Sequence, residues 1–328
     1  MISEGGDALN PTLARSRKLH AVIRTVILFL FSYYISTLVK GGDIEYYLAP
    51  RMVRYEKWAV IALFVVSLVQ LYETLTLLFN EKKTELPACD CGHDHEEQQS
   101  PIKSALIYVL FLIPLAAGFL LPNTELGSAV FVQKGVQLTG SSVLGSTAGG
   151  LSSGTADSSA DTAAPAIPAD PSTLSQADLN KLFPNKLMQV FVNHGIALFK
   201  QPLIDVTEKQ FMETLATVNL YLDNYVDKQI RISGFVYHMD NLGPNQYVLG
   251  RLAVGCCAAD AIPVGVVVEG AEPMKLGNDS WVSVKGTIAK TKIGSQNVLL
   301  VRASETEKIK KPQTGFYVYR DSGFYLAQ

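Results

Sequence analysis

All four cysteines of the chain lie in two tight groups. The first group is the run Cys89-Asp90-Cys91-Gly92-His93-Asp94-His95, and the second is the adjacent pair Cys256-Cys257. Cysteines that only fill a core behave as small hydrophobes and need no such clustering. The placement therefore favours sulfur chemistry, either metal binding or thiol redox, over simple packing.

The first group brings two thiols and two imidazoles into seven residues. Cys89, Cys91, His93 and His95 are ligands of the kind that bind Zn²⁺ or Cu⁺. Their spacing is tighter than that of a structural zinc knuckle, so a closed tetrahedral site from this segment alone would be strained. We expect a loose, exchangeable metal site. The alternative is an acidic, solvated loop in which these residue types cluster by chance.

The second group supports three interpretations. Adjacent cysteines can close only a strained disulfide, which is easily reduced. Two thiolates can instead bind one soft ion, with Asp260 or His238 as further ligands. Cys256 and Cys257 can also be packing residues at the end of a strand. A free thiol pair outside the membrane is a liability unless it is used or paired, and this favours the functional interpretations.

Three apolar segments in the first 121 residues indicate where this chemistry takes place. They run from about Leu19 to Val39, from Trp58 to Phe79, and from Ile102 or Ser104 to Leu121. Each is close to the ~20 residues that cross ~30 Å of hydrocarbon. The sequence predicts a three-helix transmembrane domain over residues 19–121, with the metal-ligand-rich loop at 80–101 and a tail at 1–18. The first segment is expected to be an uncleaved anchor, since no small-residue cleavage site follows it.

Basic residues near the segments predict the orientation, because cytoplasmic loops carry the excess of Lys and Arg. The tail has Arg15, Arg17 and Lys18, and the second loop has Lys82, Lys83 and Lys103. The first loop is also basic, whereas only Lys134 follows the third segment. The prediction is a multi-pass protein of the cell membrane with a cytoplasmic N-terminus and an extracytoplasmic C-terminal domain.

Beyond the membrane segments the composition changes twice. Residues 122–173 are expected to form a flexible linker, since from Leu138 onward they are almost all Gly, Ser, Ala, Thr, Asp and Pro. Residues 174–328 are expected to form a soluble, mainly-β domain. A flanking helix should start at a Thr207 cap, with Gln210 reaching back. Five strands should then form an OB-like barrel: Gln229–His238, Gln246–Val254, Ile262–Glu269, Ser280–Lys290 and Asn297–Ser304.

Charge argues against nucleic acid as a partner of such a barrel. From Leu174 onward there are 16 Lys and Arg against 14 Asp and Glu, with no dense basic stripe. No serine–histidine–acid set, phosphate loop or pair of catalytic carboxylates is apparent, so the sequence does not predict an enzyme.

Several of these residues also resemble a known family. The chain is similar to the bacterial YcgQ-type family of two-component membrane permease subunits. The similarity lies in the apolar segments, Gly234-Phe235-Val236-Tyr237, Arg251, Cys256-Cys257-Ala258-Ala259-Asp260-Ala261, Pro263 and Gly265. The resemblance implies a larger polytopic permease as partner, and functional positions at Arg251, Cys256, Cys257 and Asp260. The family is associated with a more His-rich loop than the two histidines found here.

Three functional hypotheses follow. The leading one is an accessory subunit of a membrane permease complex that handles a soft metal or metalloid, with Zn or Cu as the expected ion, through Cys256 and Cys257. The second is a membrane-anchored, extracytoplasmic thiol redox protein. The third is a non-catalytic docking subunit in which the cysteines only pack.

Overall fold

A computed structural model describes residues 11–79, 101–123, 126–138, 174–185, 188–270, 276–294, 296–312 and 315–326. The chain divides into two compact units, residues Met1–Thr124 and Glu125–Gln328. The loop that holds Cys89, Cys91, His93 and His95 lies outside the described residues, so its metal site stays a prediction.

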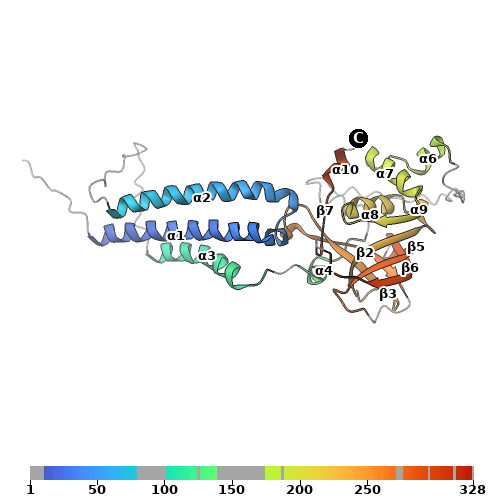
Figure 1. Ribbon diagram of the computed structural model, residues 1–328. Coiled ribbons are helices and arrows are strands. Elements are labelled where there is room, and N and C mark those ends of the chain that lie inside the picture. Colours follow the sequence, from blue (N-terminus) through green and yellow to red (C-terminus); the bar gives the residue numbers. More distant parts are fainter. Residues whose placement is uncertain are drawn as a thin grey trace, which may run out of the picture. The chain divides into compact units, whose positions relative to one another are not determined.

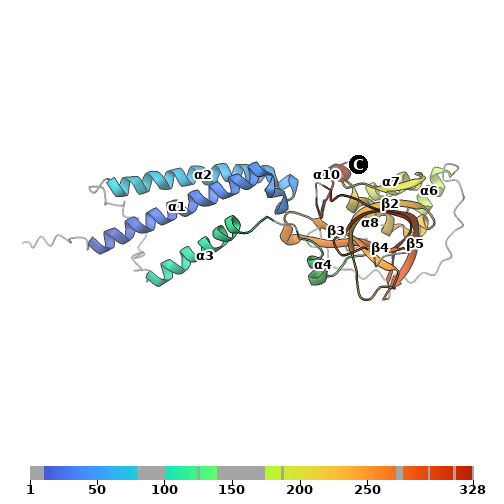
Figure 2. The same cartoon turned by 60° about the horizontal axis from the view of Figure 1, so that its bottom comes forward.

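Unit 1 consists of long apolar helices. Helix α1 (Pro11–Gly41) is followed by the short 3-10 helix η1 (Asp43–Tyr46), and then by α2 (Pro50–Phe79) and α3 (Pro101–Leu120). Helices α1 and α2 run side by side, and α3 lies along α1 (Figures 1 and 2). Buried hydroxyl groups tie the first two helices together, with Thr25 Oγ1 lying 2.9 Å from Thr74 Oγ1.

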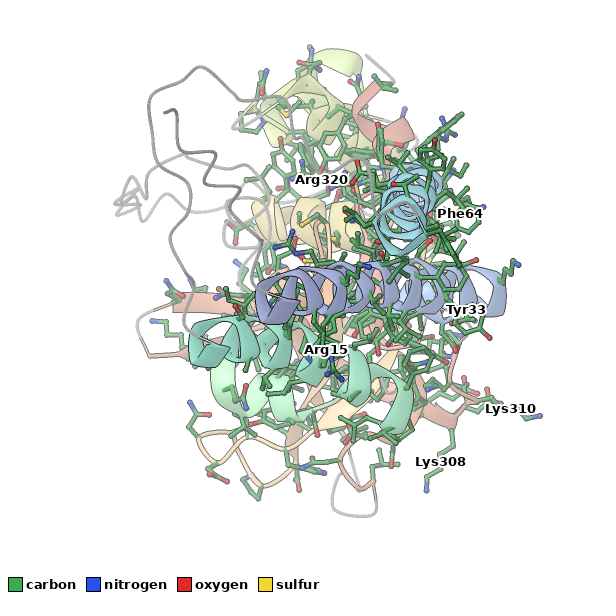
Figure 3. The ribbon with its side chains drawn as sticks, turned by 90° about the vertical axis from the view of Figure 1, so that its left-hand side faces the viewer. Arg15, Tyr33, Phe64, Lys308, Lys310 and Arg320 are labelled. Carbon is green, nitrogen blue, oxygen red and sulfur yellow. The ribbon has the colours of Figure 1, made fainter. Side chains whose placement is uncertain are left out.

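Two of these helices are long and apolar enough to cross a membrane, Lys18–Gly41 within α1 and Pro50–Phe79. Their outer faces expose large apolar side chains, including Tyr33 and Phe64, which project from α1 and α2 (Figure 3). Such faces suit lipid rather than water. Two of the three predicted spans are thus candidate membrane helices. The apolar part of α3, Ser104–Leu120, is shorter, so the third span stays a prediction.

Unit 2 is built on a seven-stranded sheet with the order β1-β2-β5-β6-β4-β3-β7. The strands are β1 (Leu203–Val206), β2 (Gln229–Tyr237), β3 (Gln246–Val254), β4 (Ile262–Glu269), β5 (Trp281–Ile293), β6 (Gln296–Lys308) and β7 (Tyr317–Tyr319). A mainly-β domain is confirmed, and the five predicted strands correspond to β2–β6. β2 also pairs with β3, where Phe235 lies opposite Gly250 and Tyr237 lies opposite Val248.

The pairings among these five strands lead from β2 through β5, β6, β4 and β3 back to β2. β2 pairs antiparallel with β5, β5 with β6, and β3 with β4, whereas β4 runs parallel to β6. The ladder between β5 and β6 has a register shift at Lys285/Gly286. A side chain at Gly286 would lie 2.3 Å from the Arg302 carbonyl oxygen. Glycine therefore allows the close backbone approach that this irregularity needs. The sheet is strongly curved (Figure 2).

Helices cover one side of the sheet and share a core with it (Figure 1). They are α6 (Gln176–Leu182), α7 (Gln189–Phe199), α8 (Phe211–Leu220) and α9 (Leu222–Tyr225), with α10 (Ser322–Leu326) near the end of the chain. Phe199, Leu215 and Ile230 are among the buried side chains of this core. Tyr225 is fully buried and donates a hydrogen bond of 2.7 Å to the Gly195 carbonyl oxygen.

The predicted helix start at Thr207 is wrong. Helix α8 begins at Phe211, and its N-cap Gln210 makes no side-chain capping bond. Tertiary contacts engage two side chains of this segment instead: Glu208 pairs with Arg251, and Gln210, the residue expected to reach back to Thr207, donates to Asp321. Local capping propensity is therefore overridden by contacts that a sequence window does not contain.

The structure also differs from the predicted linker over residues 126–138. Helix α4 (Ala129–Lys134) packs within unit 2, and Gln137 forms a bridge with Val264 of β4. Ser128 donates two hydrogen bonds to Asp279, at 2.9 and 2.8 Å. Phe131 is 2% exposed, and its ring packs edge-on against Phe235 and at a tilt against Tyr237. The rest of the predicted linker, residues 139–173, lies outside the described residues.

Candidate metal centre

The second cysteine group follows β3 in a tight loop. The loop runs from Gly255 through Cys256 and Cys257 into the 3-10 helix η3 (Ala258–Asp260), and β4 begins directly afterwards. Because β3 and β4 pair antiparallel, the loop is held at both ends by one ladder. A Cβ at position 255 would lie 2.9 Å from Asp260 Oδ2. Glycine at this position therefore lets the carboxylate approach the backbone.

Asp260 organises the loop. Its Oδ1 accepts from the Gly255 N–H at 2.8 Å, and its Oδ2 accepts from the Cys256 N–H at 2.6 Å. Burial alone would raise the pKa of Asp260, but hydrogen bonds from the Cys256 thiol and from backbone N–H groups outweigh it, and the pKa lies below its ordinary value. The carboxylate is therefore anionic at neutral pH.

The two sulfur atoms and this carboxylate come together. Cys256 Sγ, Cys257 Sγ and a carboxylate oxygen of Asp260 all lie within 4.8 Å of one another. The two sulfur atoms are 3.7 Å apart, so the thiols are free rather than bonded. Cys256 is exposed and Cys257 is partly exposed, which leaves the donor atoms open to an incoming ion. Two sulfurs and one oxygen form a donor set that suits Zn²⁺.

The electrostatics of the loop disfavour a thiolate at Cys256. The hydrogen bond to Asp260 and the neighbouring Cys257 raise the pKa of the Cys256 thiol to about 11. Thiol–disulfide exchange needs a thiolate near neutral pH, so Cys256 is a poor attacking group in this state. A bound cation would bring a positive charge next to the two sulfurs and the Asp260 carboxylate, and so would favour the thiolate forms.

A lysine that the sequence interpretation did not assign to the site also reaches this loop. Lys134, at the end of α4, donates to the carbonyl oxygens of Ala259 and Ala261 at 3.0 and 2.8 Å. These carbonyls flank Asp260 on both sides. The sequence gives no signal for this contact, since Lys134 lies more than a hundred residues earlier in a segment predicted as linker.

The structure does not place the other expected residues in this group. His238, expected as a further ligand, has its Nε2 2.6 Å from the Leu276 carbonyl oxygen, and it is not among the grouped donors. Arg251 is buried within unit 2. It pairs with Glu208 at 3.0 Å and stacks over the Trp281 ring, with its Cζ atom 4.8 Å from the ring centroid.

Arg251 has an unusual environment. Its side chain is 1% exposed, and its Nε and Nη1 have no hydrogen-bond partner among the described residues. Burial lowers its pKa, although the ion pair with Glu208 opposes this shift. The contacts place Arg251 in the packing between β3, β5 and the residues before α8. Its functional role stays a prediction.

The fold and the loop together define a class of protein: N-terminal apolar helices of membrane-spanning length, followed by a mainly-β domain with an open thiol pair. Comparison with known proteins agrees with this class. Residues 23–137 match the DUF1980 N-terminal domain, and residues 192–320 match the DUF1980 C-terminal domain. The chain belongs to the DUF1980 family, which confirms the YcgQ-type resemblance.

Two relatives extend the comparison. The UPF0703 protein YcgQ of Bacillus subtilis is 25% identical over 308 residues, which cover 91% of this chain and 99% of the relative. A Streptococcus mutans protein named "Putative two-component membrane permease complex subunit" is 24% identical over 217 residues, covering 65% of this chain and 72% of that protein. The two apolar helices of membrane-spanning length and the name of the streptococcal relative both suggest membrane association.

Proposed function

We propose that the chain is an accessory subunit of a membrane permease complex and that its β unit handles a soft metal ion through Cys256 and Cys257. The single observation that carries the metal role is the convergence of two sulfurs and the Asp260 carboxylate within 4.8 Å. The permease role rests on family membership, the two candidate membrane helices and the name of the streptococcal relative. The expected partner is a larger polytopic permease subunit.

In this proposal α3 is a third membrane span and the protein is multi-pass. Helix α3 has 20 residues, which matches the ~20 residues needed to cross ~30 Å of hydrocarbon. The Lys and Arg distribution described above supports a cytoplasmic N-terminus and a β unit outside the cell. Reaction of Cys256 with a membrane-impermeant maleimide in intact cells tests this topology. An unlabelled Cys256 that reacts only after lysis would contradict it.

The proposal also includes an OB-like barrel formed by β2–β6. The circuit β2-β5-β6-β4-β3, with β3 returning to β2 and with β4 parallel to β6, supports this assignment. Closing the circuit pairs both edges of every strand in it, which leaves no open edge among these five. The thiol loop then lies at one end of the barrel, between two strands that hold it in place.

The metal needs more ligands than the described group provides. A structural zinc site is closed by four protein ligands, whereas a site with three keeps an open position. Cys256, Cys257 and Asp260 are three, so the fourth position is available to water, to a carrier molecule or to the partner subunit. An incomplete, exposed site is suited to transferring an ion rather than to holding it permanently.

The test is metal content and transport in the Cys256→Ser/Cys257→Ser double variant. The protein should be expressed with its partner and purified from membranes after growth with Zn²⁺ or Cu⁺. We expect the bound metal to fall by at least tenfold and flux to fall with it, because hydroxyls bind these ions far more weakly than thiolates. Cys89→Ser/Cys91→Ser, which removes the other two thiols, is measured beside it to determine how much metal the predicted loop site binds. Unchanged metal content and flux in the Cys256→Ser/Cys257→Ser protein would refute the metal role and leave the docking hypothesis.

A thiol redox function is the second candidate, because the sulfur atoms lie only 3.7 Å apart. It predicts a reversible Cys256–Cys257 disulfide and exchange with a model disulfide substrate. With a pKa of about 11, the Cys256 thiol exchanges slowly with disulfides at neutral pH. Rapid exchange that alkylation abolishes, without any metal binding, would favour the redox function over ours.

A further inference from the structure

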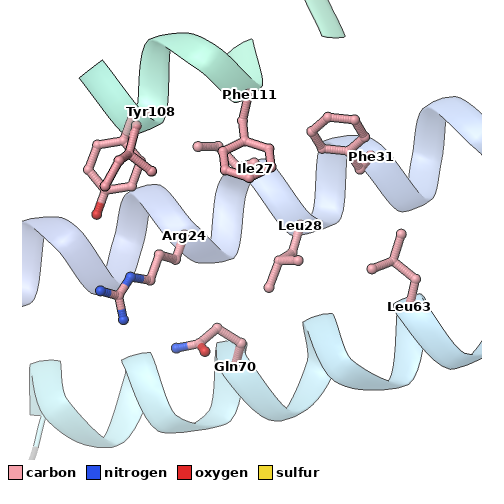
Figure 4. A pocket seen from close by; sticks show the side chains of 9 residues that line it. Arg24, Ile27, Leu28, Phe31, Leu63, Gln70, Tyr108 and Phe111 are labelled. Carbon is pink, nitrogen blue, oxygen red and sulfur yellow. The ribbon is translucent and has the colours of Figure 1, made fainter. Parts of the chain in front are cut away.

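A cavity lies among the three helices of unit 1. Its volume is about 470 Å³, and its lining comes from α1, α2 and α3 (Figure 4). Most of the walls are aliphatic or aromatic, formed for example by Leu28, Leu63 and Phe111. The volume falls in the range of ~300–1,000 Å³ that is usual for small-ligand pockets.

One end of the cavity is polar and positively charged. Arg24 and Gln70 extend toward each other across it from α1 and α2 (Figure 4). Tyr108 of α3 lies at the same end, and its hydroxyl is 2.9 Å from His20 Nδ1. None of the nine lining residues is acidic. The cavity thus combines one polar end, which carries a single guanidinium, with apolar walls elsewhere.

Arg24 lies inside a candidate membrane span. It comes six residues after Lys18, where that span begins, which corresponds to roughly 9 Å along a helix. A charged side chain at this depth is costly unless it extends to the headgroup region or meets an opposite charge. The described residues give Arg24 no acidic partner, so an anionic group would complete the site.

We propose that this cavity binds an anionic phospholipid, with one acyl chain along the apolar walls and the phosphate at Arg24. A membrane helix of a partner is ~10 Å across and ~30 Å long, so it is far too large for this volume. A small inorganic anion would not use the apolar walls. Basic pockets between membrane helices are known to hold anionic lipid headgroups. The inference rests on the membrane placement in the proposed function and is independent of the thiol site.

The experiment uses the full chain in nanodiscs that contain a photoactivatable phosphatidylglycerol, or a phosphatidylcholine carrying the same chains. We expect cross-links to wall residues of α1 and α3, such as Leu28 and Phe111, and about fivefold more labelling by the anionic lipid, as one basic residue provides at an anionic surface. Arg24→Gln should abolish this preference, whereas Arg24→Lys should retain most of it. Arg15→Gln is the matched control, because Arg15 is an exposed arginine of α1 that does not line the cavity.

A second variant keeps the proposal falsifiable if Arg24→Gln is poorly folded. Leu28→Trp adds bulk to the cavity wall and should reduce labelling by both lipids at least fivefold. Equal labelling by the two lipids, or labelling that Leu28→Trp leaves unchanged, would overturn the proposal. Displacement of the probe by equimolar palmitate would identify a free fatty acid as the occupant, and loss of labelling on partner co-expression would identify a protein segment; either result would also overturn it. Normal labelling of the Cys256→Ser/Cys257→Ser protein would separate this site from the metal function.

Discussion

At the thiol loop, one carboxylate affects both the backbone and the sulfur chemistry. Asp260 accepts two backbone N–H groups and so fixes the turn between β3 and β4. The same carboxylate raises the pKa of Cys256. Asp260 therefore orders the loop and at the same time keeps the Cys256 thiol protonated.

Asp260→Asn should make Cys256 more reactive while weakening metal binding. Removing the negative charge lowers the pKa of Cys256 from about 11 toward its ordinary value, so at pH 8 more thiolate is present and alkylation by iodoacetamide is faster, by about tenfold or more. Metal retention should fall, because an oxygen ligand is lost. Alkylation rates and metal-to-protein ratios measure both effects, with exposed Asp240→Asn as control. Slower alkylation of Asp260→Asn would contradict the assigned cause of the shift.

A second residue, Glu213, makes unit 2 sensitive to pH. Its side chain lies on α8 and is 0% exposed, with Oε1 accepting from the Asp321 N–H while Oε2 has no partner among the described residues. Burial raises its pKa from 4.5 to about 7. The neighbouring His194 shifts in the opposite sense, since burial lowers its pKa to about 4.

Glu213→Gln should stabilise unit 2 above pH 7. A carboxyl whose pKa is raised in the folded state destabilises the fold when it ionises. This penalty is absent below pH 4.5, grows between pH 4.5 and 7, and is complete above pH 7. The glutamine variant should gain on the order of 2–3 kcal/mol at pH 8 and nothing at pH 4. Denaturant unfolding of both proteins across this pH range measures the difference. An equal difference at pH 4 and pH 8 would show that Glu213 does not titrate in this window.

At the scale of elements, α4 connects the segment after α3 to the thiol loop. Phe131 anchors this short helix in the sheet, and Lys134 at its end donates to the carbonyls on both sides of Asp260. A six-residue helix is too short to be stable alone. Its position therefore depends on these tertiary contacts, and the loop's position depends partly on Lys134.

Lys134→Met should lower metal affinity more than it lowers stability. The side chain is exposed, so its two hydrogen bonds contribute only about 1 kcal/mol to folding, but without them the Asp260 backbone is less restrained. We expect about a three- to tenfold weaker metal affinity, with an unfolding midpoint close to that of the unchanged protein. Lys134→Arg should recover most of the affinity. Lys292→Met, at an exposed lysine of β5, serves as control. A large loss of stability with unchanged affinity would make Lys134 purely structural.

For the whole molecule, the low-complexity segment 139–173 connects different parts of the protein from those predicted. The sequence interpretation placed it between the membrane helices and the β domain. Residues 126–138 precede it and belong to unit 2, and α6 follows it in the same unit. The segment thus connects two parts of one unit, while only a short stretch after Leu120 joins the two units.

Halving the length of segment 139–173 should have little effect. The free energy of closing a loop whose two ends are held in one unit changes by only about 0.6 kcal/mol for each twofold change in loop length. Metal content and flux should be unchanged. By contrast, inserting about ten Gly and Ser residues between Leu121 and Leu126 lengthens the connection between the units and should reduce flux while sparing metal content. A strong loss of flux after shortening segment 139–173 would instead support the sequence-based prediction that it links the membrane helices to the β domain.

The sequence alone determined the features that depend on local pattern. Long apolar runs identified α1 and α2, alternation and glycine punctuation located β2–β6 to within a few residues, and the unusual thiol spacing singled out Cys256 and Cys257. These signals are local because burial in lipid or in a sheet acts on every residue of the element. The family resemblance followed from the same residues.

Only the tertiary structure decided which distant groups meet. Gln210 donates to Asp321 instead of reaching back to Thr207, and Glu208 pairs with Arg251. His238 Nε2 lies against the Leu276 carbonyl instead of the sulfurs. Lys134 reached the loop from 125 and 127 residues away along the chain. Such contacts depend on how strands and helices pack around a shared core, and no local window of sequence contains that information.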